Sequence, residues 1–300
     1  MAASCLPIGP LIITRQSATI SYGQDKLRRR AVANAFADQV VVITGGGRGI
    51  GRATAIEFGA EGASLLLAGR RMDALQTAAA EAMRAGAKAT EIVHCDVAKD
   101  ADLQALVGKA ISHFGRLDVL VNNAGVVAGG RLDEIGADDV ERMSTVNVWA
   151  PIRLAQLALP HMREAKSGTI VNVSSVAGRM GLPYYATYCA SKFAMRGFSE
   201  SLRREVARDG IHVMAVYPGP TATDLVENVE FTGMNMTIAT AEQVGRAIVR
   251  GVRWRTPEVF IGLGDSLISR WNDMLPWTVD YGVDMMRDRM QSAVKKQRTT

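Results

Sequence analysis

Short apolar runs alternate along the chain with longer segments in which apolar residues recur at helical spacing. From about residue 40 onward this alternation is typical of parallel strands joined by helices, because a strand covered on both faces is continuously apolar whereas a covering helix is apolar on one side. The sequence therefore predicts a single α/β domain with a doubly wound parallel sheet of about seven strands. The predicted strands span residues 39–43, 64–68, 90–94, 119–121, 169–173, 212–217 and 259–261.

The first apolar run breaks into a glycine-rich turn. Glycine permits positive φ and lets a pyrophosphate approach the backbone amides at the N-terminus of the following helix. The pattern strand, turn, helix thus predicts a nucleotide-binding turn, although its glycine spacing differs from the commonest dinucleotide fingerprint and a flexible loop is the alternative. The turn reads Thr44-Gly45-Gly46-Gly47-Arg48-Gly49-Ile50-Gly51, and Ala53, Ile56 and Ala60 then recur at helical spacing.

The residues at the end of the second predicted strand indicate which nicotinamide cofactor is bound. An acid at this position would bind the adenosine ribose hydroxyls of NAD, but Gly69 supplies no carboxylate. Arg70 offers a planar cation for a 2′-phosphate, and Arg48 in the glycine turn adds a second one. We therefore expect NADP(H) in preference to NAD(H); the alternative is that both arginines are solvated surface residues.

Two further strand ends carry candidate binding groups. Asp96-Val97 follows the third predicted strand, where an acid can cap the next helix or accept a hydrogen bond from the adenine amino group. The fourth strand runs into Asn122-Asn123-Ala124-Gly125, whose amides and glycine can form a wall beside the cofactor.

The candidate chemistry lies after the fifth strand. Ser174-Ser175 follows that strand directly, and Lys192 comes four residues after Tyr188, which places both side chains on one face of a helix. A neighbouring ammonium favours the phenolate and is expected to bring the tyrosine pKa from about 10 towards neutral, so that the phenol exchanges a proton with an alcohol oxygen. The Ser175 hydroxyl can donate to the oxygen that gains charge. A lone Tyr-x-x-x-Lys pair is weak evidence, because such pairs are usually structural.

These motifs in this order make residues 38–225 resemble the short-chain dehydrogenase/reductase family, whose members have a Rossmann-like fold. The resemblance implies that Ser175 orients a carbonyl, Tyr188 is the acid/base, and Lys192 binds the nicotinamide ribose and lowers the Tyr188 pKa. It also implies that Asn147 holds a proton-relay water and that the segment from Pro218 holds the nicotinamide carboxamide, with Thr223 favoured over Thr221. The implied catalytic residues are Asn147, Ser175, Tyr188 and Lys192, and the expected cofactor-binding residues are Thr44, Gly45, Gly47, Arg48, Gly49, Ile50, Gly51, Arg70, Asp96, Val97, Asn123, Ala124, Gly125, Tyr188, Lys192, Pro218, Gly219, Thr221 and Thr223.

The resulting functional hypothesis is an NADP(H)-dependent carbonyl reductase or alcohol dehydrogenase that transfers hydride between nicotinamide and a ketone or secondary alcohol. An apolar substrate is expected, because residues 126–131, 177–185 and 225–239 are fairly apolar. A noncatalytic NADP(H)-binding regulator and an NAD-dependent alcohol dehydrogenase are the alternatives. The side chains expected to line the substrate pocket are Met180, Leu182, Tyr185, Met234 and Met236.

Composition and charge narrow the remaining possibilities. The net charge of +5 comes from residues 1–40, which carry +3, and from the three basic residues of the tail, so the body is close to neutral and nucleic acid is not an expected partner. Three scattered cysteines indicate neither a metal site nor a disulfide framework and favour a reducing, cytoplasmic location. An organelle is the alternative if residues 1–37 are a transit peptide. No apolar run is long enough for a transmembrane helix.

The predicted domain organisation has three parts. Residues 1–37 form a poorly ordered extension, residues 38–264 the catalytic domain, and residues 265–300 an amphipathic extension with a basic tail. This last part has Leu267, Trp271 and Met274 at helical spacing before Pro276 interrupts it. We expect one of three roles for this part: covering the substrate cleft, contacting another copy in a homodimer or homotetramer, or contacting a membrane surface peripherally. Of these we favour packing or assembly.

Overall fold

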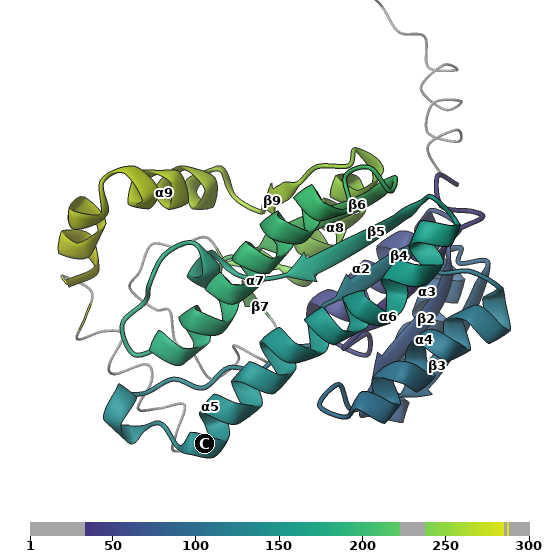
Figure 1. Cartoon of the computed structure of the whole chain (residues 1–300), viewed down its shortest axis with the longest axis horizontal. Coiled ribbons are helices and arrows are strands. Elements are labelled where there is room, and N and C mark those ends of the chain that lie inside the picture. The colour runs from purple at the N-terminus through teal and green to yellow at the C-terminus, as the bar shows by residue number, and fades with distance from the viewer. Residues whose placement is uncertain (1–33, 223–237, 285–286, 288–300) are drawn as a thin grey trace, which may run out of the picture.

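The computed structural model describes residues 34–222, 238–284 and 287. In this part of the chain seven parallel strands form one sheet in the order β3-β2-β1-β4-β5-β6-β9, which confirms the predicted fold class (Figure 1). Their bounds differ from the predicted ones by at most one residue at either end. The strands are β1 Val40–Thr44, β2 Ser64–Gly69, β3 Ala89–His94, β4 Val119–Asn122, β5 Gly168–Val173, β6 Ile211–Tyr217 and β9 Glu258–Phe260.

Helices cover both faces of the sheet. One apolar cluster packs α2, α3 and α8 against one face, and a second cluster packs α4, α6 and α7 against the other; Figure 1 shows α6 and α7 crossing in front of the strands. The five inner strands are buried almost throughout, as their continuously apolar sequences predict, whereas the edge strands β3 and β9 are partly exposed. The helices are α2 Gly49–Ala60, α3 Met72–Ala85, α4 Asp100–Phe114, α6 Ala150–Glu164, α7 Ala186–Glu205 and α8 Ala241–Arg253.

Shorter elements complete the described chain around the carboxyl ends of the strands. Two two-residue strands pair in parallel beside the main sheet; they are too short to leave a sequence pattern. The π-helical turn η2 joins α5 to α6 without a break. These elements are η1 Leu132–Glu134, α5 Ala137–Ser144, η2 Thr145–Trp149, η3 Val176–Gly178, β7 Thr221–Ala222, β8 Ala239–Thr240 and α9 Leu263–Met274.

The last connection in the sheet has the opposite hand to the others. The connections through α6 and α7 advance from β4 to β6 on one face, whereas α8 continues from β6 to β9 on the other face, against α2. Because the sheet advances in the same direction while the helix lies on the opposite face, this crossover is left-handed, whereas nearly all such crossovers are right-handed. Gly245 lets α8 pack closely on α2: a Cβ there would lie 2.9 Å from the backbone of Ala53.

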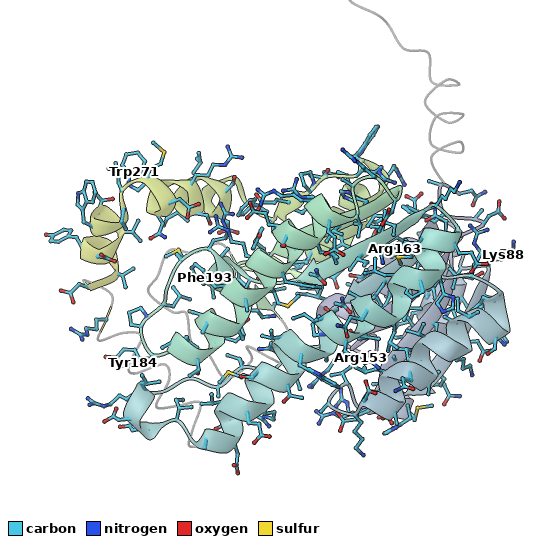
Figure 2. All side chains as sticks on the ribbon, in the orientation of Figure 1. Lys88, Arg153, Arg163, Tyr184, Phe193 and Trp271 are labelled. Carbon is cyan, nitrogen blue, oxygen red and sulfur yellow. The ribbon has the colours of Figure 1, made fainter. Side chains whose placement is uncertain are left out.

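The ends of the described chain bear on the predicted boundaries. Phe36 lies within the predicted extension, yet its ring is buried and meets Phe58 edge-on at 5.0 Å between centroids. The folded domain therefore includes residues before 38. At the other end α9 extends away from the β9 edge, and Trp271 points away from the sheet (Figures 1 and 2).

The close approach within the glycine turn generates a stability prediction. A Cβ on Gly51 would lie 2.2 Å from the Gly45 carbonyl oxygen, which belongs to the backbone and cannot swing away. We expect Gly51→Ala to lower the free energy of unfolding by at least about 2 kcal/mol, measured by urea denaturation. Gly108→Ala is the control, since a Cβ at that helical position meets nothing within 4 Å. This variant should be neutral or stabilising by up to about 1 kcal/mol, and equal destabilisation by both changes would contradict the prediction.

Candidate functional site

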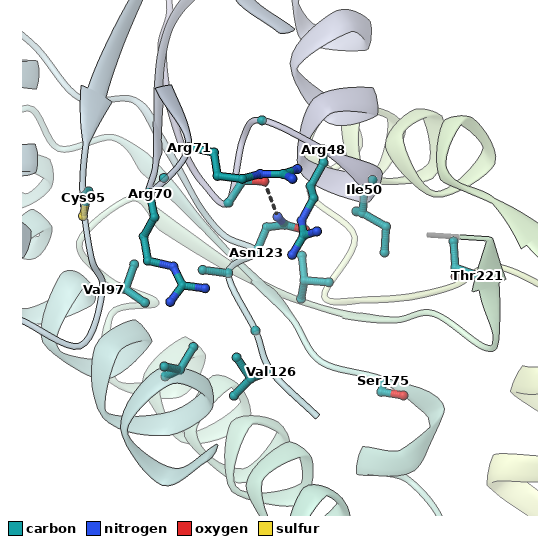
Figure 3. A pocket seen from close by; sticks show the side chains of 18 of the residues that line it. Arg48, Ile50, Arg70, Arg71, Cys95, Val97, Asn123, Val126, Ser175 and Thr221 are labelled. Atoms are coloured by element: carbon teal, nitrogen blue, oxygen red, sulfur yellow. Dashed lines mark hydrogen bonds between the residues drawn. The ribbon is translucent and has the colours of Figure 1, made fainter. Parts of the chain in front are cut away.

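A cavity of about 410 Å³ opens at the carboxyl ends of the strands, where β1 and β4 are neighbours and the chain leaves the sheet in opposite directions. Arg48, Arg70 and Arg71 gather on one side of it, and Ser175 lies towards the far side (Figure 3). Residues from the glycine turn, from the ends of five further strands and from α7 line it. They include, of the predicted site, Gly45, Gly47, Arg48, Gly49, Ile50, Arg70, Asp96, Val97, Asn123, Ala124, Gly125, Ser175, Tyr188, Lys192, Pro218, Gly219 and Thr221.

The glycine turn gives the cavity an edge of bare backbone. Gly45 and Gly49 have φ of +64° and +50°, which side chains rarely adopt. At the start of α2 the N-cap residue Arg48 makes no side-chain capping hydrogen bond, and no acidic residue lies in the first turn. The first amides of α2 and the positive end of its dipole are therefore suited to a phosphate.

Arginines dominate one side of the cavity. Arg48 and Arg70, the two predicted phosphate ligands, are exposed side chains that line it, and Gly69 between strand and cavity supplies no carboxylate. Arg71 and Arg142 line the cavity as well but were not predicted. Arg71 could have been predicted, because it directly follows Arg70 in the sequence. Arg142 could not, because it lies on α5, where it pairs with Asp139 at 3.3 Å, and belongs to no recognisable motif.

Asp96 lines the cavity but does not cap the next helix. Its Oδ1 accepts a hydrogen bond from the Ala98 amide at 3.2 Å, while the N-cap of α4 is Lys99. Of the two readings of this acid in the sequence, the capping one is therefore wrong. The carboxylate stands beside Val97 at the cavity wall.

Thr44, Gly51 and Asn147 do not line the cavity; they lie behind it. The Thr44 hydroxyl accepts from the amides of Asn123 and Ala124, both at 3.1 Å, which joins β1 to the end of β4. Gly51 packs against the Gly45 carbonyl. These residues shape the walls from behind.

Asn147 sits in the π-helical turn η2 and is almost completely buried. Its Oδ1 accepts from the Val126 amide at 2.8 Å, and its Nδ2 donates to the Val126 carbonyl at 2.8 Å and to Ser191 at 3.1 Å. The side chain therefore fixes the strand-end segment that includes Gly125 against α7. Irregular helical turns of this kind are common at functional sites.

Ser175 is the N-cap of the short helix η3. Its hydroxyl accepts from the Ala177 amide at 3.1 Å and donates to the Pro218 carbonyl at 3.4 Å. Because the Val176 amide also donates to Pro218 at 2.9 Å, the serine turn is attached to the segment after β6. Ser175 and Pro218 thus form one wall of the cavity.

Tyr188 and Lys192 stand one turn apart on α7, as the spacing predicts. The Lys192 ammonium lies 5.7 Å from the centre of the Tyr188 ring and donates to the Val173 carbonyl at 3.1 Å. Burial lowers the pKa of Lys192 to about 8. Burial also raises the pKa of Tyr188 to about 12, with the Ser175 hydroxyl acting in the opposite direction. The expected lowering of the tyrosine pKa is therefore wrong for this environment, because desolvation outweighs the hydrogen bond with Ser175.

Several predicted residues do not contribute to the cavity or cannot be placed. Met180, Leu182 and Tyr185 do not line it; Leu182 and Tyr185 instead pack with Cys189 in a small cluster beside Tyr188. Thr223, Met234 and Met236 lie outside the described residues.

In the described part of the chain, no cluster of three or more His, Cys, Asp or Glu side chains is arranged to bind a metal ion. No helix in this part is both long enough and apolar enough to cross a bilayer.

Comparison with known proteins identifies the family. Residues 39–232 match the family model described as short chain dehydrogenase, which is more than half of the chain. The chain therefore belongs to the short chain dehydrogenase family, and it is an oxidoreductase that acts on CH–OH or C=O groups with NAD(P).

Three similar proteins show the range of this family. An 11-beta-hydroxysteroid dehydrogenase-like 4A protein of Arabidopsis thaliana is 36% identical over 220 residues, 71% of this chain and 73% of the relative. Levodione reductase superposes with a TM-score of 0.72 at 29% identity, covering 77% of this chain and 99% of that one. A short chain dehydrogenase/reductase from Burkholderia phymatum in complex with NAD gives a TM-score of 0.72 at 28% identity, covering 78% and 92%.

The buried ammonium makes stability depend on pH in a defined direction. The unfolded lysine holds its proton up to about pH 10.5 and the folded Lys192 releases it near pH 8, so the unfolded state binds more protons between these values and stability rises with pH. As the pH rises from about 8 to about 9.5, we expect the unfolding free energy of the wild type to increase by about 2 kcal/mol relative to that of Lys192→Met. Urea titrations at each pH measure the difference. Lys88→Met removes an exposed lysine, so its difference in unfolding free energy from the wild type should not change with pH. If the difference for Lys192→Met is also constant with pH, the prediction is contradicted.

Proposed function

We propose that the protein is an NADP(H)-dependent carbonyl reductase that reduces an apolar ketone to a secondary alcohol, and that Ser175, Tyr188 and Lys192 carry the chemistry. The observation that supports this most strongly is their placement on one wall of a cavity whose opposite side holds the glycine turn and three arginines. A nicotinamide dinucleotide would use both sides of this cavity, since it joins a phosphate-rich half to a reactive ring.

The chain's own residues fit such a cofactor. The uncapped N-terminus of α2 and the bare glycine backbone suit its pyrophosphate, and the carboxylate of Asp96 suits the adenine amino group. Lys192 would hold the nicotinamide ribose, Asn123, Ala124 and Gly125 would contact the nicotinamide half, and the segment that begins with Pro218, Gly219 and Thr221 would bind its carboxamide; the same role for Thr223 stays a prediction. When bound, the nicotinamide supplies the hydride.

The proposed reaction depends on three side chains. The Ser175 hydroxyl orients the carbonyl oxygen and donates to it as negative charge develops, and Tyr188 delivers its phenolic proton to that oxygen. Lys192 holds a positive charge beneath the phenol, which stabilises the phenolate left behind. Asn147 acts from behind the cavity by fixing the Val126 backbone and, through Ser191, the helix that carries both Tyr188 and Lys192.

Burial raises the Tyr188 pKa to about 12, so the phenol carries its proton at neutral pH. A protonated phenol can donate to a carbonyl oxygen directly. The same groups serve the reverse reaction, which requires the phenolate, so we expect alcohol oxidation to become faster as the pH rises.

The preference for NADP(H) rests on the arginines at the adenosine side. Arg48, Arg70 and Arg71 line the cavity there, and Gly69 leaves no acid to bind ribose hydroxyls. A 2′-phosphate is a dianion that guanidinium groups bind bidentately. The NAD-bound neighbour keeps the NAD-dependent alternative open to test.

The proposal of an apolar substrate has separate support. Similar proteins are named for 11-beta-hydroxysteroid dehydrogenase and levodione reductase, and Val126, Val146 and Val173 add apolar surface to the cavity of this chain. A cytoplasmic location and a homodimer or homotetramer stay predictions. They are checked by fractionation of tagged full-length protein and by light scattering.

Removal of the phenolic hydroxyl tests the reaction. We expect Tyr188→Phe to lower kcat for carbonyl reduction by at least about 1,000-fold, because no other group at that wall donates the proton, while the Kd for NADPH changes less than about threefold. Stopped assays and fluorescence titration measure the two quantities. Tyr185→Phe is the matched control: its ring lies 6.5 Å from that of Tyr188 and its buried hydroxyl has no hydrogen-bond partner, so turnover should persist. Retained turnover in Tyr188→Phe would refute the proposal.

Removal of one guanidinium tests the choice of cofactor. We expect Arg70→Ala to raise the KM for NADPH by about tenfold or more and the KM for NADH by less than about twofold, because only NADPH loses a charge-assisted hydrogen bond. Arg84→Ala, on α3 with its guanidinium directed to the Ala80 carbonyl, is the control. A wild type that prefers NADH, or equal effects on both cofactors, would count against NADP(H) selection.

A further inference from the structure

The helix α9 contacts the domain through its polar face. Ser269 is completely buried and Asp273 reaches arginines of the body, whereas Leu267, Trp271 and Met274 are exposed, with more than half of each side chain accessible. The apolar stripe that the sequence offers for packing therefore faces outward in the described structure. What attaches this helix to the domain is a set of hydrogen bonds and ion pairs.

The centre of this attachment is Arg179, a cation with only 6% of its surface exposed. Its guanidinium pairs with Glu258 at 3.1 Å and with Asp273 at 3.0 Å, and it lies 5.5 Å from the centre of the Tyr217 ring. The Tyr217 hydroxyl donates to the same Glu258 at 3.1 Å. A charge this deeply buried is tolerated only while its partners remain, so α9 supplies one of two carboxylates that hold Arg179 in place.

Arg179 also terminates the turn that carries Ser175. Its amide donates to the Val176 carbonyl at 2.9 Å, and its own carbonyl accepts from Asn272 of α9 at 3.3 Å. Four residues before Arg179, Ser175 caps the same turn. The residue after Tyr217 is Pro218, whose carbonyl accepts from Ser175 and Val176. Both segments that fix the serine hydroxyl therefore end on the cluster formed by Arg179, Glu258 and Asp273.

We infer that Asp273 of α9 is a positioning residue for Ser175: by holding Arg179 it fixes the turn after β5 and thereby the direction of the serine hydroxyl in the cavity. The consequence for turnover rests on the proposed function, whereas the mechanical link does not. The C-terminal extension thus contributes to the site without lining it.

Hydrogen exchange tests the link without cofactor or substrate. In full-length Asp273→Asn, backbone amides of residues 175–180 are expected to exchange at least about tenfold faster, because the turn opens more often when Arg179 loses a carboxylate. Asp273→Glu should restore slow exchange. Asp209→Asn is the control, since Asp209 pairs with Arg163 at 2.8 Å and contributes nothing to the Arg179 cluster; exchange at 175–180 should be unchanged in it.

Kinetics of the same variants test the consequence for the site. For Asp273→Asn we expect kcat for carbonyl reduction to fall about tenfold, KM for NADPH to stay within about twofold, and the loss to be rescued by Asp273→Glu. Because the Ser175 hydroxyl opposes the rise of the Tyr188 pKa, the pH profile of alcohol oxidation should also move to higher pH.

Unchanged exchange at 175–180, or faster exchange spread evenly over the sheet, would overturn the inference, the latter because it indicates general destabilisation. Faster local exchange with unchanged kcat and pH profile would overturn the positioning role. If the wild type turns over no carbonyl compound at all, the proposed function fails, and the exchange experiment still decides whether α9 holds the turn.

Discussion

The architecture of the site depends on one junction between neighbouring strands. At the end of β1 the Thr44 hydroxyl accepts two amides from the end of β4, and the Asn123 side chain donates back to the carbonyls of Thr44 at 2.9 Å and Gly45 at 3.2 Å. A crevice opens here because the helices that follow β1 and β4 cover opposite faces. The reciprocal hydrogen bonds join the two strand ends that border this crevice. They fix the position of the bare glycine backbone relative to the Asn-Ala-Gly segment on the other side.

The chemistry at the other wall relies on burial that is unfavourable by itself. Lys192 keeps 6% of its surface exposed and has the Val173 carbonyl as its hydrogen-bond acceptor, while the centre of the Tyr188 ring lies 5.7 Å from its ammonium. Desolvation moves the two pKa values apart, to about 8 for Lys192 and about 12 for Tyr188. Stability is lost at this wall and gained in the two apolar clusters beneath it.

The sequence predicts most of the fold and the membership of the site, for physical reasons. Strands buried on both faces leave continuous apolar runs such as 40–43, and the helical spacing of Tyr188 and Lys192 fixes their common face. What the sequence does not show is which side chains line the cavity and which support it: Thr44 and Asn147 lie behind the wall, and Arg142 reaches the cavity from α5. The direction of the Tyr188 pKa was also missed, because desolvation depends on tertiary packing. The helical spacing of the apolar residues in α9 was predicted, whereas the contact of its polar face with the domain was not.

The left-handed connection through α8 has a consequence for how the protein is made. One apolar cluster is completed only when α8 packs on α2, and Arg246 then lies 3.5 Å from Glu57, 189 positions earlier in the chain. A nascent chain that has emerged from the ribosome only as far as β6 therefore leaves the side of α2 that carries Ala53 and Glu57 without its partner helix. Because this contact joins residues so far apart in the sequence, the packing of α2 is completed late in synthesis, and part of its surface stays exposed to water until then.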